Sequence, residues 1–138
     1  MKQNEQCWIL TGGYHKRLFW AYASHRSEGH PGGVHFPYQW VMKREEKYGN
    51  IIGFKHTHPG MNGSPSIVDD STMKQWVFSF GKPLLCLIEG IDGLNAYLYY
   101  DDENEPIKVN VIKSFGQLIV GITPKIKDAA NGNQQVSS

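Results

Sequence analysis

The residues best suited to chemistry in this sequence lie between positions 56 and 69. His56 and His58 are separated by one residue, and Ser66 and Asp69 follow after a short loop. Two imidazole nitrogens and one carboxylate oxygen are ligands that zinc accepts, and a catalytic zinc site keeps its fourth tetrahedral position open for water. This run therefore predicts a mononuclear zinc site, and a hydrolase is the first hypothesis.

The segment before the histidines predicts the strand that would position them. Residues 51–58 are strand-like, and alternation would place four side chains on one core-facing side: Ile52, Phe54, His56 and His58. Pro59 and Gly60 end this strand. A helix is then expected from Ile67 to about Phe80, with Asp69 in its first turn.

Each half of this pattern also has an ordinary structural explanation. Ser66-Ile67-Val68-Asp69 is a good helix capping box, with Ser66 as the N-cap. A His-x-His pair on a strand is more often two ordinary histidines than a metal site. The metal site is favoured because the capping serine and acid directly follow a suitably spaced histidine pair.

His56-Thr57-His58-Pro59, followed by Ser66-x-x-Asp69, resembles the signature of the JAMM metalloproteases, the MPN-plus or JAB-domain family. The resemblance implies one Zn²⁺ per chain, with His56, His58 and Asp69 as its ligands. It also implies that Ser66 contacts the water or the oxyanion. A glutamate near the start of the domain would be the general acid and base.

Glu5 is the candidate for that glutamate, because it precedes a short apolar segment that ends at Gly12, as in the family. Its competitors precede no matching segment; they are Glu28, Glu45, Glu46 and Glu89. The alternative for Glu5 is a solvated residue of a frayed terminus. Family members carry a strand and a helix before this glutamate, so we expect a C-terminal helix or a second subunit to replace them, or a true start further upstream.

The resemblance implies an α/β fold of the α+β type. A mixed, mostly antiparallel sheet would be flanked by helices, as in the cytidine-deaminase-like JAB/MPN fold. Residues 1–122 would form this single domain, and the polar residues 123–138 a flexible tail. Further strands are expected at 7–11, 18–24, 84–89, 94–100 and 107–112, a hairpin at Gly12-Gly13, a helix at 37–48, and either structure at 118–122.

Composition agrees with a single small enzyme. A chain of 138 residues with 40% hydrophobic content suits one domain, and a net charge of +1 without a basic stripe argues against nucleic acid as a partner. No signal peptide or apolar stretch of ~20 residues is present, so we expect no membrane span and a cytoplasmic protein. Cys7 and Cys86 are expected to be free, buried thiols.

The implied reaction is hydrolysis of a peptide or isopeptide bond after the C-terminal tail of ubiquitin or a ubiquitin-like protein. Glu5 would activate a zinc-bound water, with zinc and Ser66 stabilising the oxyanion. Residues 25–36 are interpreted as an insertion that covers the substrate tail, and the lack of room between Asp69 and Leu84 argues against the insertion that selects lysine-63 linkages. Small size favours a prokaryotic or phage stand-alone enzyme, with homo-oligomerisation left open.

Two alternatives remain open at this point. A phage-tail or cell-wall peptidase could use the same zinc site on a different substrate. A catalytically silent MPN scaffold is the non-enzymatic alternative, although such proteins normally lack one or more of the ligands present here.

Overall fold

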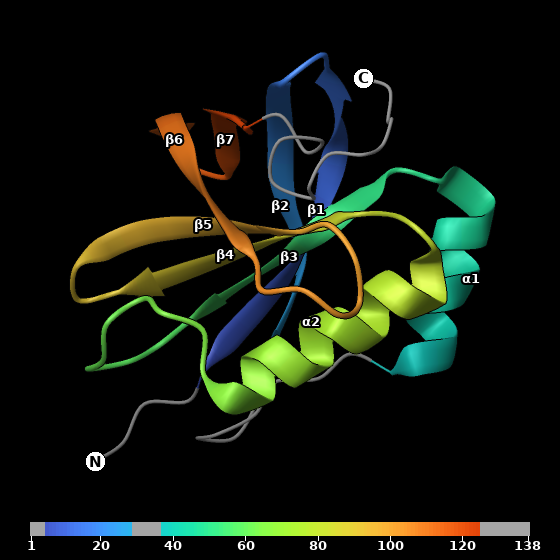
Figure 1. The fold of residues 1–138 in the computed structure, drawn as a ribbon, viewed down its shortest axis with the longest axis horizontal. Coiled ribbons are helices and arrows are strands. Elements are labelled where there is room, and N and C mark those ends of the chain that lie inside the picture. The colour runs from blue at the N-terminus through green and yellow to red at the C-terminus, as the bar shows by residue number, and fades with distance from the viewer. Residues whose placement is uncertain (1–4, 29–36, 125–138) are drawn as a thin grey trace.

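The computed structural model describes residues 5–28 and 37–124. Their elements lie in the order β1 (Gln6–His15), β2 (Leu18–Glu28), α1 (Tyr38–Tyr48), β3 (Ile51–Thr57), α2 (Ile67–Phe80), β4 (Leu84–Gly90), β5 (Gly93–Tyr99), β6 (Ile107–Phe115) and β7 (Leu118–Ile122) (Figure 1). Residues 29–36 of the expected insertion and residues 125–138 of the expected tail lie outside the described part. The first residues of that expected insertion, from His25 to Glu28, belong to β2.

The seven strands form a closed barrel in the order β1-β2-β7-β6-β5-β4-β3. The prediction of a mixed, mostly antiparallel sheet flanked by helices, in a cytidine-deaminase-like JAB/MPN fold, was therefore wrong. Closure depends on β7, which pairs antiparallel with β2 from Leu18 opposite Ile122 to Tyr22 opposite Leu118. The only parallel pair in the described barrel is β3 with β4, and α2 lies in the crossover between them.

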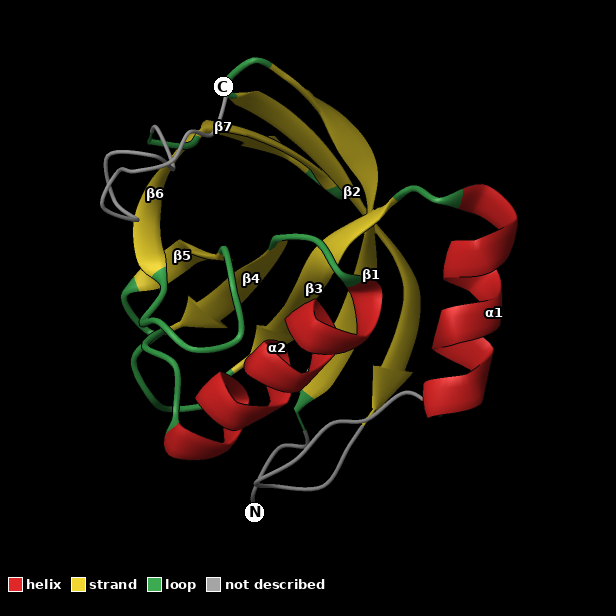
Figure 2. Cartoon of the chain, turned by 45° about the vertical axis from the view of Figure 1, so that its right-hand side comes forward, coloured by secondary structure: helices red, strands yellow, loops and turns green. Residues whose placement is uncertain are grey.

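Two apolar clusters hold this architecture together. The first fills the barrel and includes Leu10, Phe19 and Leu87. The second lies between the outer face of the sheet and the helices, and it includes Phe54 of β3 and Met73 of α2. Figure 2 shows α2 crossing the outside of the barrel with α1 beside it. This outer cluster packs α2 against β3, the two elements that carry the candidate ligands His56 and Asp69.

The first hairpin turns later than the sequence suggested. Gly12 and Gly13 lie inside β1, and the turn falls at Lys16, which has a φ of 57°. A Cβ at Gly12 would overlap the backbone oxygen of Trp20. Gly12 therefore permits a close approach between strands rather than a turn.

The expected common face of β3 is interrupted. Phe54 packs in the outer cluster, whereas Ile52 packs inside the barrel. The register between β1 and β3 shifts at this point, because Leu10 is opposite Gly53 while Thr11 is opposite Ile51. The irregularity turns Ile52 inward and leaves Phe54 on the side of α2.

The two expected helices are present, with α2 spanning the predicted residues. Gly49 and Gly81 end α1 and α2 in the left-handed conformation. Neither described helix has the length and apolar character needed to cross a membrane.

Candidate metal centre

Three predicted ligands converge on one point outside the barrel. His56 lies near the end of β3, His58 directly follows this strand, and Asp69 is in the first turn of α2. His56 Nε2 is 3.2 Å from His58 Nε2 and 3.2 Å from Asp69 Oδ1. His58 Nε2 is 3.0 Å from Asp69 Oδ2. The sequence-based prediction that these three residues could form a metal-binding group is confirmed.

The contacts of His58 leave a place for a proton or a metal ion between its ring and Asp69. His58 Nδ1 lies 2.9 Å from the carbonyl oxygen of Asn62, an acceptor, so Nδ1 carries the proton. In the neutral ring, the lone pair of Nε2 then faces a carboxylate oxygen of Asp69 at 3.0 Å. Two acceptors this close are stabilised only by a proton or a metal ion between them.

The spacing also fits a metal. Ligands about 2.0–2.1 Å from a tetrahedral zinc ion lie roughly 3.3 Å from one another. The separations of 3.0 to 3.2 Å among His56, His58 and Asp69 are close to that value. The bond from His58 to the Asn62 carbonyl also fixes the ring orientation, as outer-shell partners of metal-binding histidines commonly do.

Asp69 is both a member of the capping box of α2 and a candidate metal ligand. Its backbone N–H donates to Ser66 Oγ at 3.0 Å, and its Oδ2 accepts the Ser66 N–H at 2.9 Å. Burial raises the pKa of the Asp69 carboxyl, but hydrogen bonding to His56, the charge of His56 and the Ser66 amide outweigh it and lower this pKa to about 2. The carboxylate is therefore ionised at neutral pH, as a ligand must be.

Ser66 adopts the predicted N-cap position at the entrance to this cluster. Its Oγ accepts the Asp69 N–H, and within the described residues its hydroxyl proton has no acceptor. Ser66 is exposed, so this proton is available to an oxygen atom of a bound molecule.

The loop between the histidines and α2 is fastened to the β4–β5 turn. The Gly63 N–H donates to Asp92 Oδ1 at 2.9 Å, and the Tyr97 hydroxyl donates to the Gly63 oxygen at 3.1 Å. Ile91 N–H donates to the Met61 oxygen at 2.8 Å. The sequence did not predict these positioning contacts, because Asp92 and Tyr97 belong to no motif and the third contact joins backbone groups.

A second contact fixes α2 on the sheet. Tyr99 is fully buried in β5, and its hydroxyl donates to Asp70 Oδ1 at 3.0 Å. Lys74 forms an ion pair with the other oxygen of Asp70 at 2.9 Å. Because Asp70 directly follows Asp69, these bonds hold the first turn of α2 in the position that the ligand requires.

Replacing Gly90 with alanine should weaken metal binding by moving the loop. A Cβ at Gly90 would overlap Gly63 N and approach the Met61 oxygen to 2.6 Å. Relief of the overlap displaces the loop, at a cost in stability of roughly 1–3 kcal/mol. Zinc titration with thermal unfolding measures both effects, and the exposed loop variant Ser64→Ala is the control. Unchanged zinc affinity in Gly90→Ala would show that the fastened loop does not position the ligands.

Glu5 directly precedes β1, the strand that pairs with the strand of His56. Cys7 of β1 is directly opposite His56, and the Gln6 N–H donates to Thr57 Oγ1 at 3.0 Å. Extending this register by two residues beyond the paired strands would bring Glu5 opposite His58. The convergent group of three ligands does not include Glu5, and its role as the general base stays a prediction.

The thiol of Cys7 is influenced by both acidic residues of this region. Burial raises its pKa to about 12, with smaller contributions from the charges of Glu5 and Asp69. Cys7 and Cys86 are free and buried, as expected from the sequence.

Stability is expected to fall in alkaline solution because of this thiol. The folded pKa of Cys7 is raised from 9.0 to about 12, so the proton is held more tightly in the folded state. The resulting stabilisation is fully present below pH 9 and is lost as the pH rises towards about 12. Thermal unfolding across this interval measures the loss. Cys7→Ala should lose less stability over the same interval, and an equal loss in both proteins would contradict the assignment to Cys7.

Comparison with known proteins gives no family. No family model matches the chain, and no curated protein is similar to it in sequence. The fold and the site thus define a small β-barrel protein with a candidate metal centre on its outer face.

Proposed function

We propose that this protein is a zinc-dependent hydrolase of the JAMM type that cleaves a peptide or isopeptide bond. The observation that carries the proposal is the convergence of His56, His58 and Asp69, with His58 Nε2 3.0 Å from a carboxylate oxygen. The likeness to the JAMM family rests on the motif alone, since the described strands form a closed barrel and not the helix-flanked sheet expected with that family.

Zinc is the metal that suits this donor set. Two imidazoles and one carboxylate are typical of catalytic zinc sites, whereas calcium and magnesium are bound mainly by oxygen atoms. Three protein ligands leave one position open. When bound, zinc supplies a Lewis acid that polarises a carbonyl group and makes a water molecule more acidic at neutral pH.

Two side chains would complete the reaction. Glu5 would take a proton from the attacking water at its carboxylate and deliver it to the departing amine. Ser66 would donate its hydroxyl hydrogen to the carbonyl oxygen of the substrate, because its Oγ already accepts the Asp69 N–H. The capping box therefore orients the Ser66 hydroxyl and the Asp69 carboxylate at the same time.

The proposed substrate is a protein with an extended C-terminal tail, such as ubiquitin or a ubiquitin-like protein. Two exposed apolar side chains on the segments that carry the ligands could contact such a tail. They are Met61, 59% exposed, and Ile67, 89% exposed. Met61 follows His58 within the loop, and Ile67 directly follows Ser66, so both lie on the segments that carry the site.

Cleavage of ubiquitin fusions and of ubiquitin-like fusions by the zinc-loaded protein tests this function. We expect activity that a chelator removes and added zinc restores. A cell-wall peptide serves as the comparison substrate, and His15→Ala, which removes an exposed histidine of β1, serves as the control variant. A zinc-loaded protein that cleaves none of these substrates would contradict a hydrolase and favour a scaffold.

A further inference from the structure

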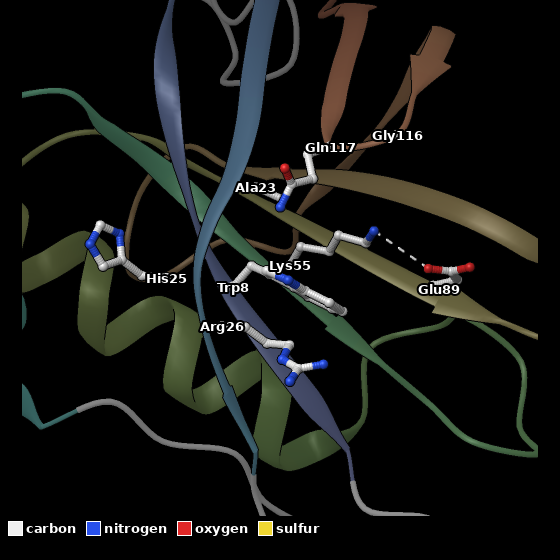
Figure 3. A pocket seen from close by; sticks show the side chains of 8 residues that line it. All are labelled: Trp8, Ala23, His25, Arg26, Lys55, Glu89, Gly116 and Gln117. Atoms are coloured by element: carbon white, nitrogen blue, oxygen red, sulfur yellow. Dashed lines mark ion pairs between the residues drawn. The ribbon is translucent and has the colours of Figure 1, made fainter.

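A pocket of about 460 Å³ opens at one end of the barrel. Its size lies within the range of pockets that hold small organic molecules. Its lining is shown in Figure 3 and consists of Trp8, Ala23, His25, Arg26, Lys55, Glu89, Gly116 and Gln117.

The pocket lies on the opposite side of the strands from the metal ligands. Trp8 is directly opposite Lys55 across the β1–β3 pair, and Lys55 is opposite Leu87, which packs inside the barrel. Directly paired residues share one face of a sheet, so Trp8 and Lys55 face the barrel interior. His56 follows Lys55 in the strand and therefore points to the outside.

The strands separate at this end of the barrel. β5 pairs with β6 only where Ala96 to Leu98 meet Ile107 to Val109, so the beginning of β5 has no partner on that side. The turn between β6 and β7 instead reaches β2, where the Ala23 N–H donates to the Gln117 oxygen at 2.9 Å. The resulting opening admits solvent to the end of an otherwise apolar interior.

The pocket lining contains more positive than negative side chains: Arg26 and Lys55 against Glu89. Lys55 forms an ion pair with Glu89 at 3.4 Å, and its Nζ lies 4.7 Å from the centre of the Trp8 ring. The Lys55 side chain is only 13% exposed, against 54% for Glu89. Among the described residues, the guanidinium group of Arg26 forms no hydrogen bond or ion pair. Two cations and one carboxylate therefore line the pocket, and the charge of Arg26 has no ionic partner among the described residues.

The pocket lining also contains a neutral hydrogen-bond donor, the side-chain amide of Gln117. The side-chain oxygen of Gln117 accepts the Tyr22 hydroxyl at 2.8 Å. Its amide nitrogen is thus left with two hydrogens to donate. Trp8 adds a flat apolar surface beside the cations, which suits an aromatic or aliphatic group.

We propose that the barrel-end pocket binds a small organic anion, a carboxylate or phosphate attached to an apolar group. Arg26 holds the anionic group through its planar fork of donors, and the apolar part lies against Trp8, with the Gln117 amide as a further donor of the lining. Carboxylates and phosphates share the geometry that an arginine recognises, so the chemistry of the pocket defines both. The proposal does not depend on the metal centre, since the two sites use opposite faces of β1 and β3.

Nuclear magnetic resonance titration of the full chain with benzoate, phenyl phosphate and inorganic phosphate tests the proposal. The indole N–H signal of Trp8 is followed, assigned through Trp8→Phe, with and without zinc. We expect saturable shifts with benzoate or phenyl phosphate, the same in both metal states, and weaker binding of inorganic phosphate. The stronger of the two aromatic probes identifies the anion. No saturable shift at about 10 mM of any probe would overturn the proposal.

Charge variants sharpen the test. Arg26→Gln should weaken probe binding by roughly tenfold or more, since charge-assisted hydrogen bonds are lost. Glu89→Gln should strengthen binding severalfold, because it removes the competing carboxylate. Lys43→Gln, which removes an exposed charge on α1, should leave binding unchanged. Equal affinities for wild type, Arg26→Gln and Glu89→Gln would show that the Trp8 shift does not report an anion site.

Discussion

Glu5→Gln is expected to retain bound zinc and to lower the rate of hydrolysis by about 10²–10⁴-fold, the usual contribution of general acid–base catalysis. Glutamine keeps the size of the side chain but cannot accept the proton of the attacking water. Zinc binding should persist because Glu5 is not among the three convergent ligands. Metal content and the rate constant for cleavage of a ubiquitin-type fusion are measured on the same preparation.

The matched control for this variant is Glu46→Gln, which neutralises an exposed glutamate of α1. It should have wild-type metal content and wild-type activity. Full activity in Glu5→Gln would exclude Glu5 as the base. Loss of zinc from Glu5→Gln would instead assign this residue to the coordination of the metal.

His58→Ala is expected to abolish both zinc binding and hydrolysis. His58 is the central member of the cluster, because its Nε2 faces His56 at 3.2 Å and Asp69 at 3.0 Å. It is only 5% exposed, so no other side chain of the surface can take its place without rearrangement. Removal leaves two ligands, fewer than catalytic zinc sites use.

Thermal unfolding provides a measurement of this loss that does not require a substrate. Zinc at a hundredfold excess over its dissociation constant should stabilise the wild-type fold by about 2.7 kcal/mol. The same concentration should not stabilise His58→Ala, whereas His15→Ala should respond like wild type. An undiminished response in His58→Ala would place the bound zinc elsewhere on the chain.

Single helices and strands were predictable because caps, terminal glycines and apolar runs are all visible within short segments of the sequence. The limits of α2 follow from the Ser66 cap and from Gly81, and β4 and β5 lie where apolar runs surround a glycine-containing turn. Closure of the barrel was not predictable, since it depends on pairing between residues 18–22 and 118–122. A short apolar segment such as Leu118–Ile122 carries no information on its partner strand.

Two details of strand geometry could not be predicted from turn residues or from the alternation of side chains. Gly12 was predicted to mark a turn, but it allows Trp20 to approach β1 closely. Ile52 was predicted to share a face with Phe54, but the register shift against β1 turns it into the barrel. Both cases depend on contacts with a neighbouring strand that alternation alone does not reveal.

The ligands of the candidate site were predictable because a strand end, a loop and a helix cap bring them together within one segment. The supporting contacts come from other elements. Asp92 and Tyr97 hold the loop, and Tyr99 holds α2 through Asp70. None of these residues belongs to a motif, so only the three-dimensional arrangement links them to the site.

The most direct test of the metal centre is X-ray absorption spectroscopy at the zinc edge of the zinc-loaded protein. The arrangement of His56, His58 and Asp69 predicts one zinc ion with two imidazole nitrogens and two oxygens at about 2.0–2.2 Å. One oxygen belongs to Asp69, and the other to a solvent molecule. A sulfur atom at about 2.3 Å, or fewer than two imidazole ligands, would contradict this centre.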